Sequence, residues 1–151
     1  MREKLEVDVT YAARRPWVPR RTQFEMWARA ALAGLSCHSV LSVLVVGTAR
    51  SRSLNSRYRR KDRSTNVLSF SGPGASPDGR NYLGELVICA PVVAREALAQ
   101  GKSRESHWAH MTVHGVLHLL GFDHVRDAEA AKMTAREIQI LDQLGFSNPY
   151  V

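Results

Sequence analysis

Three histidines in the last third of the chain have the spacing expected of ligands to one metal ion. His114 and His118 are four residues apart, so on a helix both imidazoles project from the same face, one turn apart. Gly121 can adopt the left-handed conformation that ends a helix, and the chain would then return and bring His124 toward the same point. Three neutral imidazoles and one open coordination position are typical of catalytic zinc. The pattern predicts one zinc ion, although nickel, copper or iron would also bind three imidazoles.

The residue after the first of these histidines argues against a familiar protease chemistry. The spacing His-x3-His-x5-His also occurs in metzincin proteases, where a glutamate directly after the first histidine acts as general base. Here that position is Gly115, which has no side chain to accept a proton. The sequence therefore predicts metal binding without a peptidase of that kind, and it leaves the general base unassigned.

Polar residues next to the three histidines admit more than one interpretation. His107 and His110 continue the same helical face, either as partners of the ligands, as substrate contacts, or as polar positions of an amphipathic helix. Asp123 either orients an imidazole, serves as a base, or makes local hydrogen bonds in a turn. Sequence alone does not choose between these roles.

A basic segment in the first half of the chain suits a polyanionic partner. The formal net charge is +7, which favours nucleic acid over other partners. Guanidinium groups bind phosphate in a bidentate manner, and Tyr58 could stack on an unpaired base. The alternative is a solvated charged face, which is the usual meaning of a charge run. The seven cations of this segment are Arg50, Arg52, Arg57, Arg59, Arg60, Lys61 and Arg63.

Hydrophobic periodicity predicts an α/β fold that positions these residues. We expect a single domain over residues 1–151, with a four-stranded mixed sheet, about five helices and the metal site at the end of a central helix. Residues 71–80 contain three glycines and two prolines and are expected to be a loop. The strand order stays open. The expected strands are 5–9, 40–46, 67–70 and 83–89, and the expected helices are 24–35, a short one within 50–63, 91–100, 107–120 and 128–144.

Composition narrows the cellular context. No apolar run approaches the roughly 20 residues that a bilayer-spanning helix requires. Residues 1–9 alternate charged and apolar side chains and lack the continuous apolar stretch of a secretory signal. Cys37 and Cys89 lie far apart without ligand-like spacing, which favours two reduced thiols. We therefore expect a cytoplasmic protein without a membrane partner.

Two long motifs and two shorter ones lie between residue 54 and residue 150. The first long motif is Leu54-Asn55-x-x-Tyr58-Arg59-x-Lys61-Asp62-x-x-Thr65-Asn66-Val67-Leu68-Ser69-Phe70. The second is His107-Trp108-x-His110, followed by His114-Gly-x-Leu117-His118-Leu119-x-Gly121-x-Asp123-His124. The shorter ones are residues 83–88 and the ending at residues 148–150. With these motifs the chain resembles the YbeY family of bacterial endoribonucleases from residue 54 to residue 150.

The resemblance implies a zinc-dependent endoribonuclease specific for single-stranded RNA. It implies a role in 16S ribosomal RNA 3′ end maturation and in ribosome quality control, with ribosomal RNA, the small ribosomal subunit and assembly proteins as partners. By position, His114, His118 and His124 would bind zinc, and Arg59 and His114 would be needed for catalysis. Glu85 stands where the family usually has aspartate, and Cys89 where it often has serine.

Two other functions compete with this interpretation. One is a metallohydrolase acting on peptides or small molecules, and the other is a non-catalytic, ribosome-associated RNA-binding protein with a structural zinc. Structural zinc sites usually have four protein ligands and favour cysteine, and no fourth ligand is evident near the histidines. For the nuclease, we expect zinc to polarise a phosphoryl oxygen and activate water, while Arg59 offsets charge on the phosphate. RNA sequence preference, oligomeric state and the attacking group, water or the 2′-hydroxyl, are not given by the sequence.

Overall fold

The alternating and helical patterns form four strands and five helices in the part of the chain that the structure describes. The structure is a computed structural model, and it describes residues 4–33, 38–122 and 126–151. Each predicted element is present, with ends that shift by a few residues. In chain order the elements are β1 (Lys4–Tyr11), α1 (Arg21–Ala31), β2 (His38–Val46), α2 (Thr48–Arg59), β3 (Val67–Ala75), β4 (Arg80–Cys89), α3 (Ala90–Ala99), α4 (Arg104–Leu119) and α5 (Asp127–Gln143).

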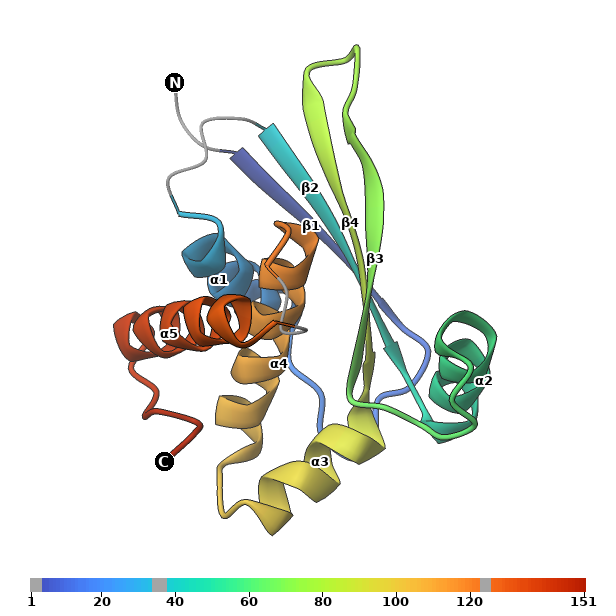
Figure 1. Ribbon diagram of the computed structural model, residues 1–151. Helices are drawn as coiled ribbons and strands as arrows, with labels where there is room; N and C mark the ends of the chain where they lie inside the picture. The colour runs from blue at the N-terminus through green and yellow to red at the C-terminus, as the bar shows by residue number, and fades with distance from the viewer. Residues whose placement is uncertain (1–3, 34–37, 123–125) are drawn as a thin grey trace.

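The four strands form one mixed sheet in the order β1-β2-β4-β3 (Figure 1). Strands β1, β2 and β4 are parallel, and β3 runs antiparallel to β4 at the edge. Strand β2 is flanked on both sides, and its Leu41, Val43 and Val45 are buried. The residues between them are only partly buried, so β2 presents these three side chains to the main core on one face of the sheet.

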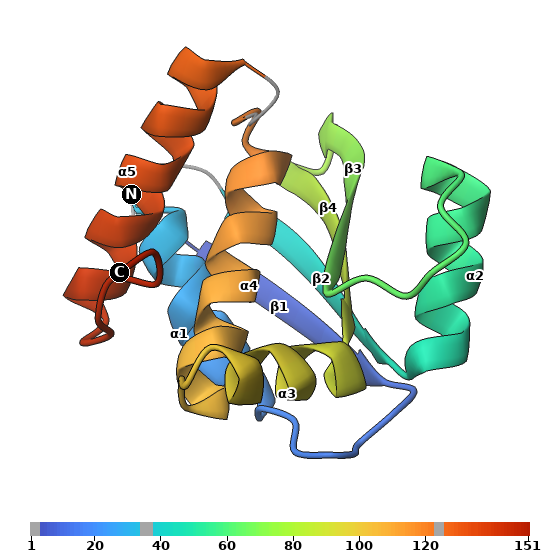
Figure 2. The same ribbon diagram turned by 60° about the horizontal axis from the view of Figure 1, so that its bottom comes forward.

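Helices cover the two faces of the sheet unequally. Helices α1, α4 and α5 lie on one face, and α2 lies on the other (Figure 2). The main core is on the first face, where Phe24 makes edge-on contacts with both Trp27 and Trp108, and all three rings are fully buried. Because α4 lies between the sheet and α5, it is the central helix of this layer. No helix in the described ranges combines the length and the apolar character needed to cross a membrane.

The prediction of a loop over residues 71–80 is wrong for most of its length. Strand β3 continues to Ala75 and β4 begins at Arg80, so the two strands form a long hairpin that extends beyond the helices. Pro73 is compatible with a strand here because β3 is the edge of the sheet, where a missing N–H breaks no ladder. Gly84 has φ +143°, and an added Cβ would lie 2.2 Å from the Phe70 carbonyl oxygen, which explains the glycine at this step of the hairpin.

The thiol prediction is confirmed for one of the two cysteines. Cys89 is a free thiol with no exposed surface, at the junction of β4 and α3. A small apolar side chain suits this position, and burial makes the thiol unreactive. Cys37 lies outside the described residues.

Candidate metal centre

Helix α4 presents three histidines along one face. It begins after Ser103, whose hydroxyl oxygen accepts the backbone N–H of Ser106. The ring centroids of His110 and His114 are 6.2 Å apart, and those of His114 and His118 are 4.7 Å apart. His114 and His118 therefore lie next to each other, one helical turn apart, as their spacing predicts; their binding of a common ion stays a prediction.

The end of α4 is formed as the sequence predicts. Gly121 has φ +98°, its N–H donates to the His118 carbonyl, and the Phe122 N–H donates to the Leu117 carbonyl. This pair of hydrogen bonds is the Schellman arrangement, which reverses the chain at a left-handed glycine. The third predicted ligand, His124, and its neighbour Asp123 lie outside the described residues. The participation of His124 therefore stays a prediction.

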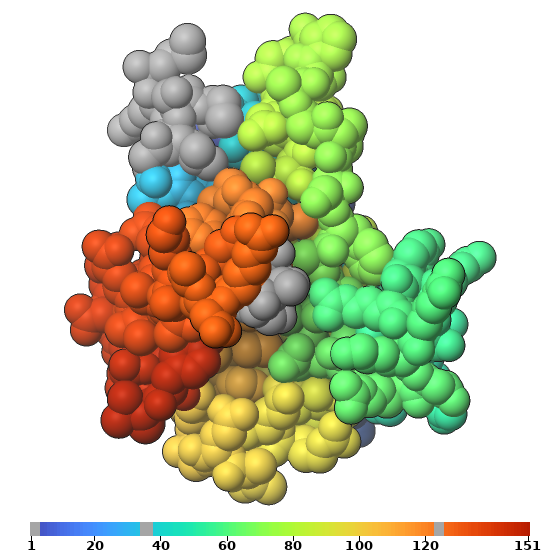
Figure 3. All heavy atoms as spheres, viewed as in Figure 1, coloured from blue at the N-terminus to red at the C-terminus, as the bar shows by residue number. Residues whose placement is uncertain are grey.

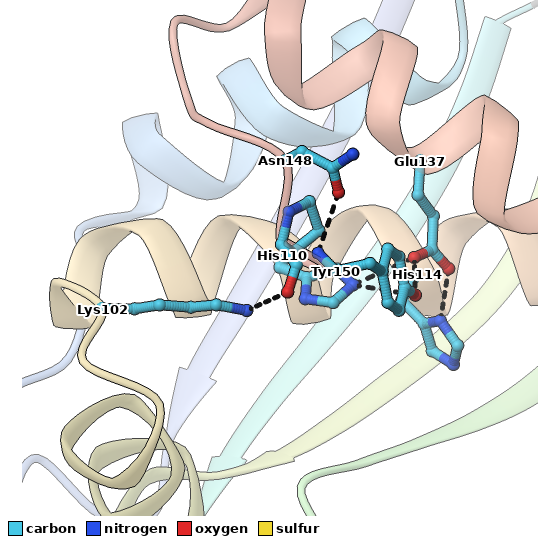
Figure 4. A network of polar contacts seen from close by, with 7 residues as sticks. Lys102, His110, His114, Glu137, Asn148 and Tyr150 are labelled. Atoms are coloured by element: carbon cyan, nitrogen blue, oxygen red, sulfur yellow. Dashed lines mark hydrogen bonds and ion pairs between the residues drawn. The ribbon is translucent and has the colours of Figure 1, made fainter.

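A buried carboxylate from α5 contacts two of the histidines of α4. Glu137 has 1% of its surface exposed. Its Oε1 lies 2.5 Å from Nδ1 of His114, and its Oε2 lies 2.9 Å from Nε2 of His110 (Figure 4). The hydroxyl of Tyr150 donates to the same Oε2. Glu137 is thus hydrogen-bonded through both oxygens to groups from α4 and from the C-terminal segment.

These contacts keep the carboxylate charged. Burial by itself would raise the pKa of Glu137, but the hydrogen bonds from His110 and His114 outweigh it and lower the pKa to about 2. Burial lowers the pKa of His110, so its ring is neutral at pH 7 although Glu137 opposes that shift. Burial and the hydrogen bond to Glu137 both raise the pKa of Tyr150. At neutral pH the cluster is therefore one carboxylate that accepts from imidazole and phenol donors.

Among the described residues, His110, His114 and Glu137 form a cluster that could hold a metal ion. One ligand atom of each lies within 4.8 Å of the others. This cluster shares only His114 with the predicted trio of His114, His118 and His124. Imidazole nitrogens and a carboxylate are suitable ligands for zinc and for other transition metals.

Sequence reasoning missed Glu137, although a signal was available. Sequence periodicity alone places Met133, Ile138, Leu141 and Leu144 on the apolar side of the last helix. In the structure its buried residues are Met133, Glu137, Ile140 and Leu141. Glu137 stands four residues from both Met133 and Leu141, in the middle of the apolar stripe. A charged residue at such a position is almost never fully buried unless it is paired, so it indicates a partner elsewhere in the chain.

His107 occupies a separate, structural position. It is 2% exposed, and its Nε2 lies 2.9 Å from Oε1 of Glu96 on α3. Glu96 also accepts from the Asn66 amide, which precedes β3. This is a role that the sequence did not offer: His107 forms a buried polar link between α4, Glu96 of α3 and the residue before β3.

We expect Glu96→Gln to remove a stability contribution that depends on pH. Burial raises the pKa of Glu96, but hydrogen bonds from His107 and Asn66 give a net lowering below the ordinary value of 4.5. A lowered folded-state pKa stabilises the fold above pH 4.5, and this contribution is lost as the pH falls below that value. Urea unfolding should show the variant less stable by about 1 kcal/mol at pH 7, allowing for partial exposure of the carboxylate.

The gap between wild type and Glu96→Gln should shrink as the pH is lowered from 5 toward 3. Asp142→Asn, an exposed carboxylate on α5, serves as the control and should change unfolding little at either pH. A gap that widens in acid would contradict the assigned direction of the Glu96 pKa.

Gly115 faces the sheet and lies in a tightly packed position. A Cβ added there would lie 2.7 Å from a methyl of Leu86 and 3.3 Å from the Ser69 hydroxyl. The Ser69 hydroxyl donates to the Gly115 carbonyl over 3.1 Å. The position after the first histidine carries the general base in metzincins. Here that position faces β3 and β4, which leave no room for a side chain. The structure thus agrees with the sequence argument against that protease chemistry.

The basic segment forms a lobe that stands away from the helical layer (Figure 3). All seven of its cations are exposed, and Arg52 pairs with Asp62 at 2.8 and 3.0 Å. Tyr58, in the last turn of α2, is 59% exposed and contacts Phe70 of β3 edge-on at 5.1 Å between centroids. Arg59 is its neighbour, so the last turn of α2 is fixed against the same strand whose Ser69 contacts α4 beside His114.

Comparison with known proteins identifies the family. The model of the family described as endoribonuclease YbeY matches residues 16–145. The chain belongs to the YbeY family. The match begins well before residue 54, where the recognisable motifs start, so it includes α1 and β2, whereas β1 precedes it.

A solved structure supports the same fold. The solution structure of TM1509 from Thermotoga maritima matches with a TM-score of 0.63 and 19% sequence identity, over 91% of this chain and 88% of that chain. At this identity the likeness shows the fold alone. Because the chain belongs to the YbeY family, it is an endoribonuclease-family protein. Its substrate class is RNA, and its process is rRNA processing.

Proposed function

We propose that this YbeY-family protein is a zinc-dependent endoribonuclease that cleaves single-stranded RNA. It would act in 16S ribosomal RNA 3′ end maturation and in ribosome quality control, on the small ribosomal subunit in the cytoplasm. One observation carries the proposal most directly: His114 lies one turn from His118 and is held by a buried, ionised Glu137. Such a carboxylate–histidine pair is the usual support of a catalytic metal ligand.

The donor set suits zinc. In the proposal His114, His118 and His124 hold the ion, and a fourth position is left for water or substrate. When bound, zinc would supply Lewis-acid polarisation of a phosphoryl oxygen and activation of water at neutral pH. Glu137 would keep the His114 ring in one orientation, and Gly121 would end α4 beside the site.

The distances to Glu137 favour this trio over direct coordination by the carboxylate. Two ligands of a tetrahedral zinc, each at 2.0–2.1 Å, are separated from one another by about 3.3 Å. The observed separations of Glu137 oxygens from ring nitrogens are 2.5 Å to His114 and 2.9 Å to His110, which are hydrogen-bond distances. A proton therefore lies between Glu137 and His114, and the second His114 nitrogen points away from the carboxylate (Figure 4).

Arg59 and its neighbours would bind the RNA backbone. Seven exposed cations on one lobe attract phosphates, and a single acidic residue, Asp62, lies among them. Arg59, in the last turn of α2, would stabilise charge on the phosphate that is cleaved. Tyr58 offers an exposed ring on which an unpaired base could stack.

We expect Arg59→Glu to lower cleavage of single-stranded RNA by about 10²–10³-fold, the usual loss when one charge-stabilising donor is removed. Zinc content should be unchanged, because Arg59 is not a ligand in the proposal. The measurement is kcat/KM on an RNA oligonucleotide together with metal analysis.

Arg50→Glu makes the same charge change in the first turn of α2 and serves as the matched control. It should weaken RNA binding modestly and in a salt-dependent way, with kcat preserved. Equal loss of kcat in both variants would reduce the role of Arg59 to general electrostatic attraction.

The deciding experiment compares substrates with and without a chelator. Purified protein is incubated with single-stranded RNA, double-stranded RNA and a peptide pool, before and after removal of metal and after zinc is restored. We expect cleavage of single-stranded RNA only, lost on chelation and recovered with zinc. Peptide cleavage would favour the rival metallohydrolase, and tight zinc and RNA binding without cleavage would favour the non-catalytic zinc protein. Mapping the 16S ribosomal RNA 3′ end in cells that lack the protein tests the ribosomal role.

A further inference from the structure

Glu137 joins three segments of the chain at a buried point behind His114. Glu137 lies in the third turn of α5. Its carboxylate is hydrogen-bonded to two histidines of α4 and to the hydroxyl of Tyr150. His110, which shares Oε2 with Tyr150, is 7% exposed. A charge this deeply buried is costly unless hydrogen bonds satisfy it, and here both oxygens have donors.

The partners of Glu137 are themselves held in place. Lys102 donates to the Pro149 carbonyl over 2.8 Å, and the Tyr150 N–H donates to the Asn148 side-chain oxygen over 2.8 Å (Figure 4). The first bond ties the C-terminal segment to Lys102, just before α4, and the second closes a turn within residues 148–150. Tyr150 is thereby presented to Oε2, which leaves Oε1 to His114.

This division of oxygens determines which tautomer His114 adopts. An ionised carboxylate can only accept hydrogen bonds, so the nitrogen facing it, Nδ1, must carry the proton. A neutral imidazole has one protonated nitrogen, so Nε2 then carries the lone pair. Figure 4 shows Nε2 on the side of the ring opposite Glu137. A metal ligand requires a lone pair in that position.

We propose that Glu137 is a positioning residue that fixes His114 in the Nδ1–H tautomer and in one ring orientation, while His110 and Tyr150 hold its second oxygen. Glu137 is therefore a partner of a ligand and does not itself bind the ion. This inference rests on the proposed role of His114 as a metal ligand. It also assigns His110, whose role the sequence left open, to the support of the site.

The test uses three substitutions at one position and measures zinc affinity in a competition with a chromophoric chelator. Glu137→Ala should bind zinc 10–100-fold more weakly, as expected when a ligand loses its partner. Glu137→Met removes the acceptor but keeps the volume, so it provides the same information if the alanine variant does not fold. Glu137→Gln keeps an oxygen that can accept from His114 and should lie within about tenfold of wild type. Asp142→Asn, an exposed carboxylate on the same helix, should equal wild type.

A second readout needs neither zinc nor RNA. Long-range ¹⁵N–¹H NMR of the metal-free protein reports which nitrogen of the His114 ring is protonated. We expect Nδ1–H in wild type and Glu137→Gln, and a mixture of tautomers in Glu137→Ala or Glu137→Met. Equal loss of zinc affinity in all three variants would make Glu137 a direct ligand. Unchanged affinity and tautomer in the alanine or methionine variant would remove its role altogether.

The outcomes separate this inference from the proposed function. Zinc binding that depends on Glu137 in a protein that cleaves no RNA would leave the inference standing and overturn the nuclease. If the protein cleaves RNA in a metal-dependent way and its zinc affinity does not change on substitution of Glu137, the nuclease would stand and this inference would be overturned.

Discussion

His118→Ala is expected to abolish both zinc retention and RNA cleavage while the fold is preserved. The imidazoles of His114 and His118 lie 4.7 Å apart between centroids on one helix face, which is the chelating pair of the proposed site. Structural zinc binding is worth about 10–16 kcal/mol over four ligands, so loss of one ligand should weaken binding by roughly 10²–10³-fold or more. Cleavage should fall by about 10³-fold or more, because the ion supplies several kcal/mol of transition-state stabilisation.

The fold should tolerate this change because alanine is a better helix former than histidine and His118 is only partly buried. Metal analysis after dialysis and turnover of a single-stranded RNA oligonucleotide are the measurements, with circular dichroism to check folding. His38→Ala is the matched control, since His38 is on β2 and pairs with Glu6 over 3.0 Å. A zinc-free His118→Ala protein that still cleaves RNA fully would end the proposal of a metal-dependent nuclease.

Gly115→Glu, which restores the glutamate of metzincin proteases, is expected to destabilise the protein severely and to create no peptidase. The new side chain would meet a methyl of Leu86 at 2.7 Å from its first carbon, in a position buried between α4 and the sheet. Overpacking costs about 1–3 kcal/mol, and placing a carboxyl group in an apolar core without a partner costs several more. We expect a loss of more than about 4 kcal/mol, a large part of the stability of an ordinary domain.

Gly115→Ala separates the steric effect from the charge. Leu86 must shift for a methyl group to fit. Replacing glycine by alanine inside a helix, however, stabilises the helix by up to about 1 kcal/mol. The alanine variant should therefore unfold within about 1–2 kcal/mol of wild type in urea. Native-like stability of Gly115→Glu, or any zinc-dependent cleavage of peptides by it, would show that this side of α4 is open to a general base.

Several features of the site could be predicted because they are local. The spacing of His114 and His118 places two rings on one helix face whatever surrounds the helix. The Schellman ending at Gly121 follows from the steric freedom of glycine one turn later. For the same reason Gly115 could be read correctly as a position without a base. None of these conclusions needs information about residues more than a few positions away.

Other features could not be predicted because they depend on which distant segments pack together. Glu137 meets His114 across 23 residues of sequence, and only the packing of α5 on α4 brings them to 2.5 Å. A hydrophobic pattern shows which face of α5 is buried, but not what lies against it. The hairpin of β3 and β4 was underestimated because backbone pairing overrides the turn propensity of glycine and proline at an edge strand.

The sequence by itself determined the types and order of the elements, the basic segment and the adjacent pair His114 and His118, because these features depend on residues that are close together in the chain. The tertiary structure alone decided the strand order β1-β2-β4-β3 and the buried network around Glu137. Those features arise from the burial of apolar faces against one another, a cooperative property of the whole chain. The site combines both: α4 provides the imidazoles, and the packing of α5 and residues 148–150 fixes how His114 is presented.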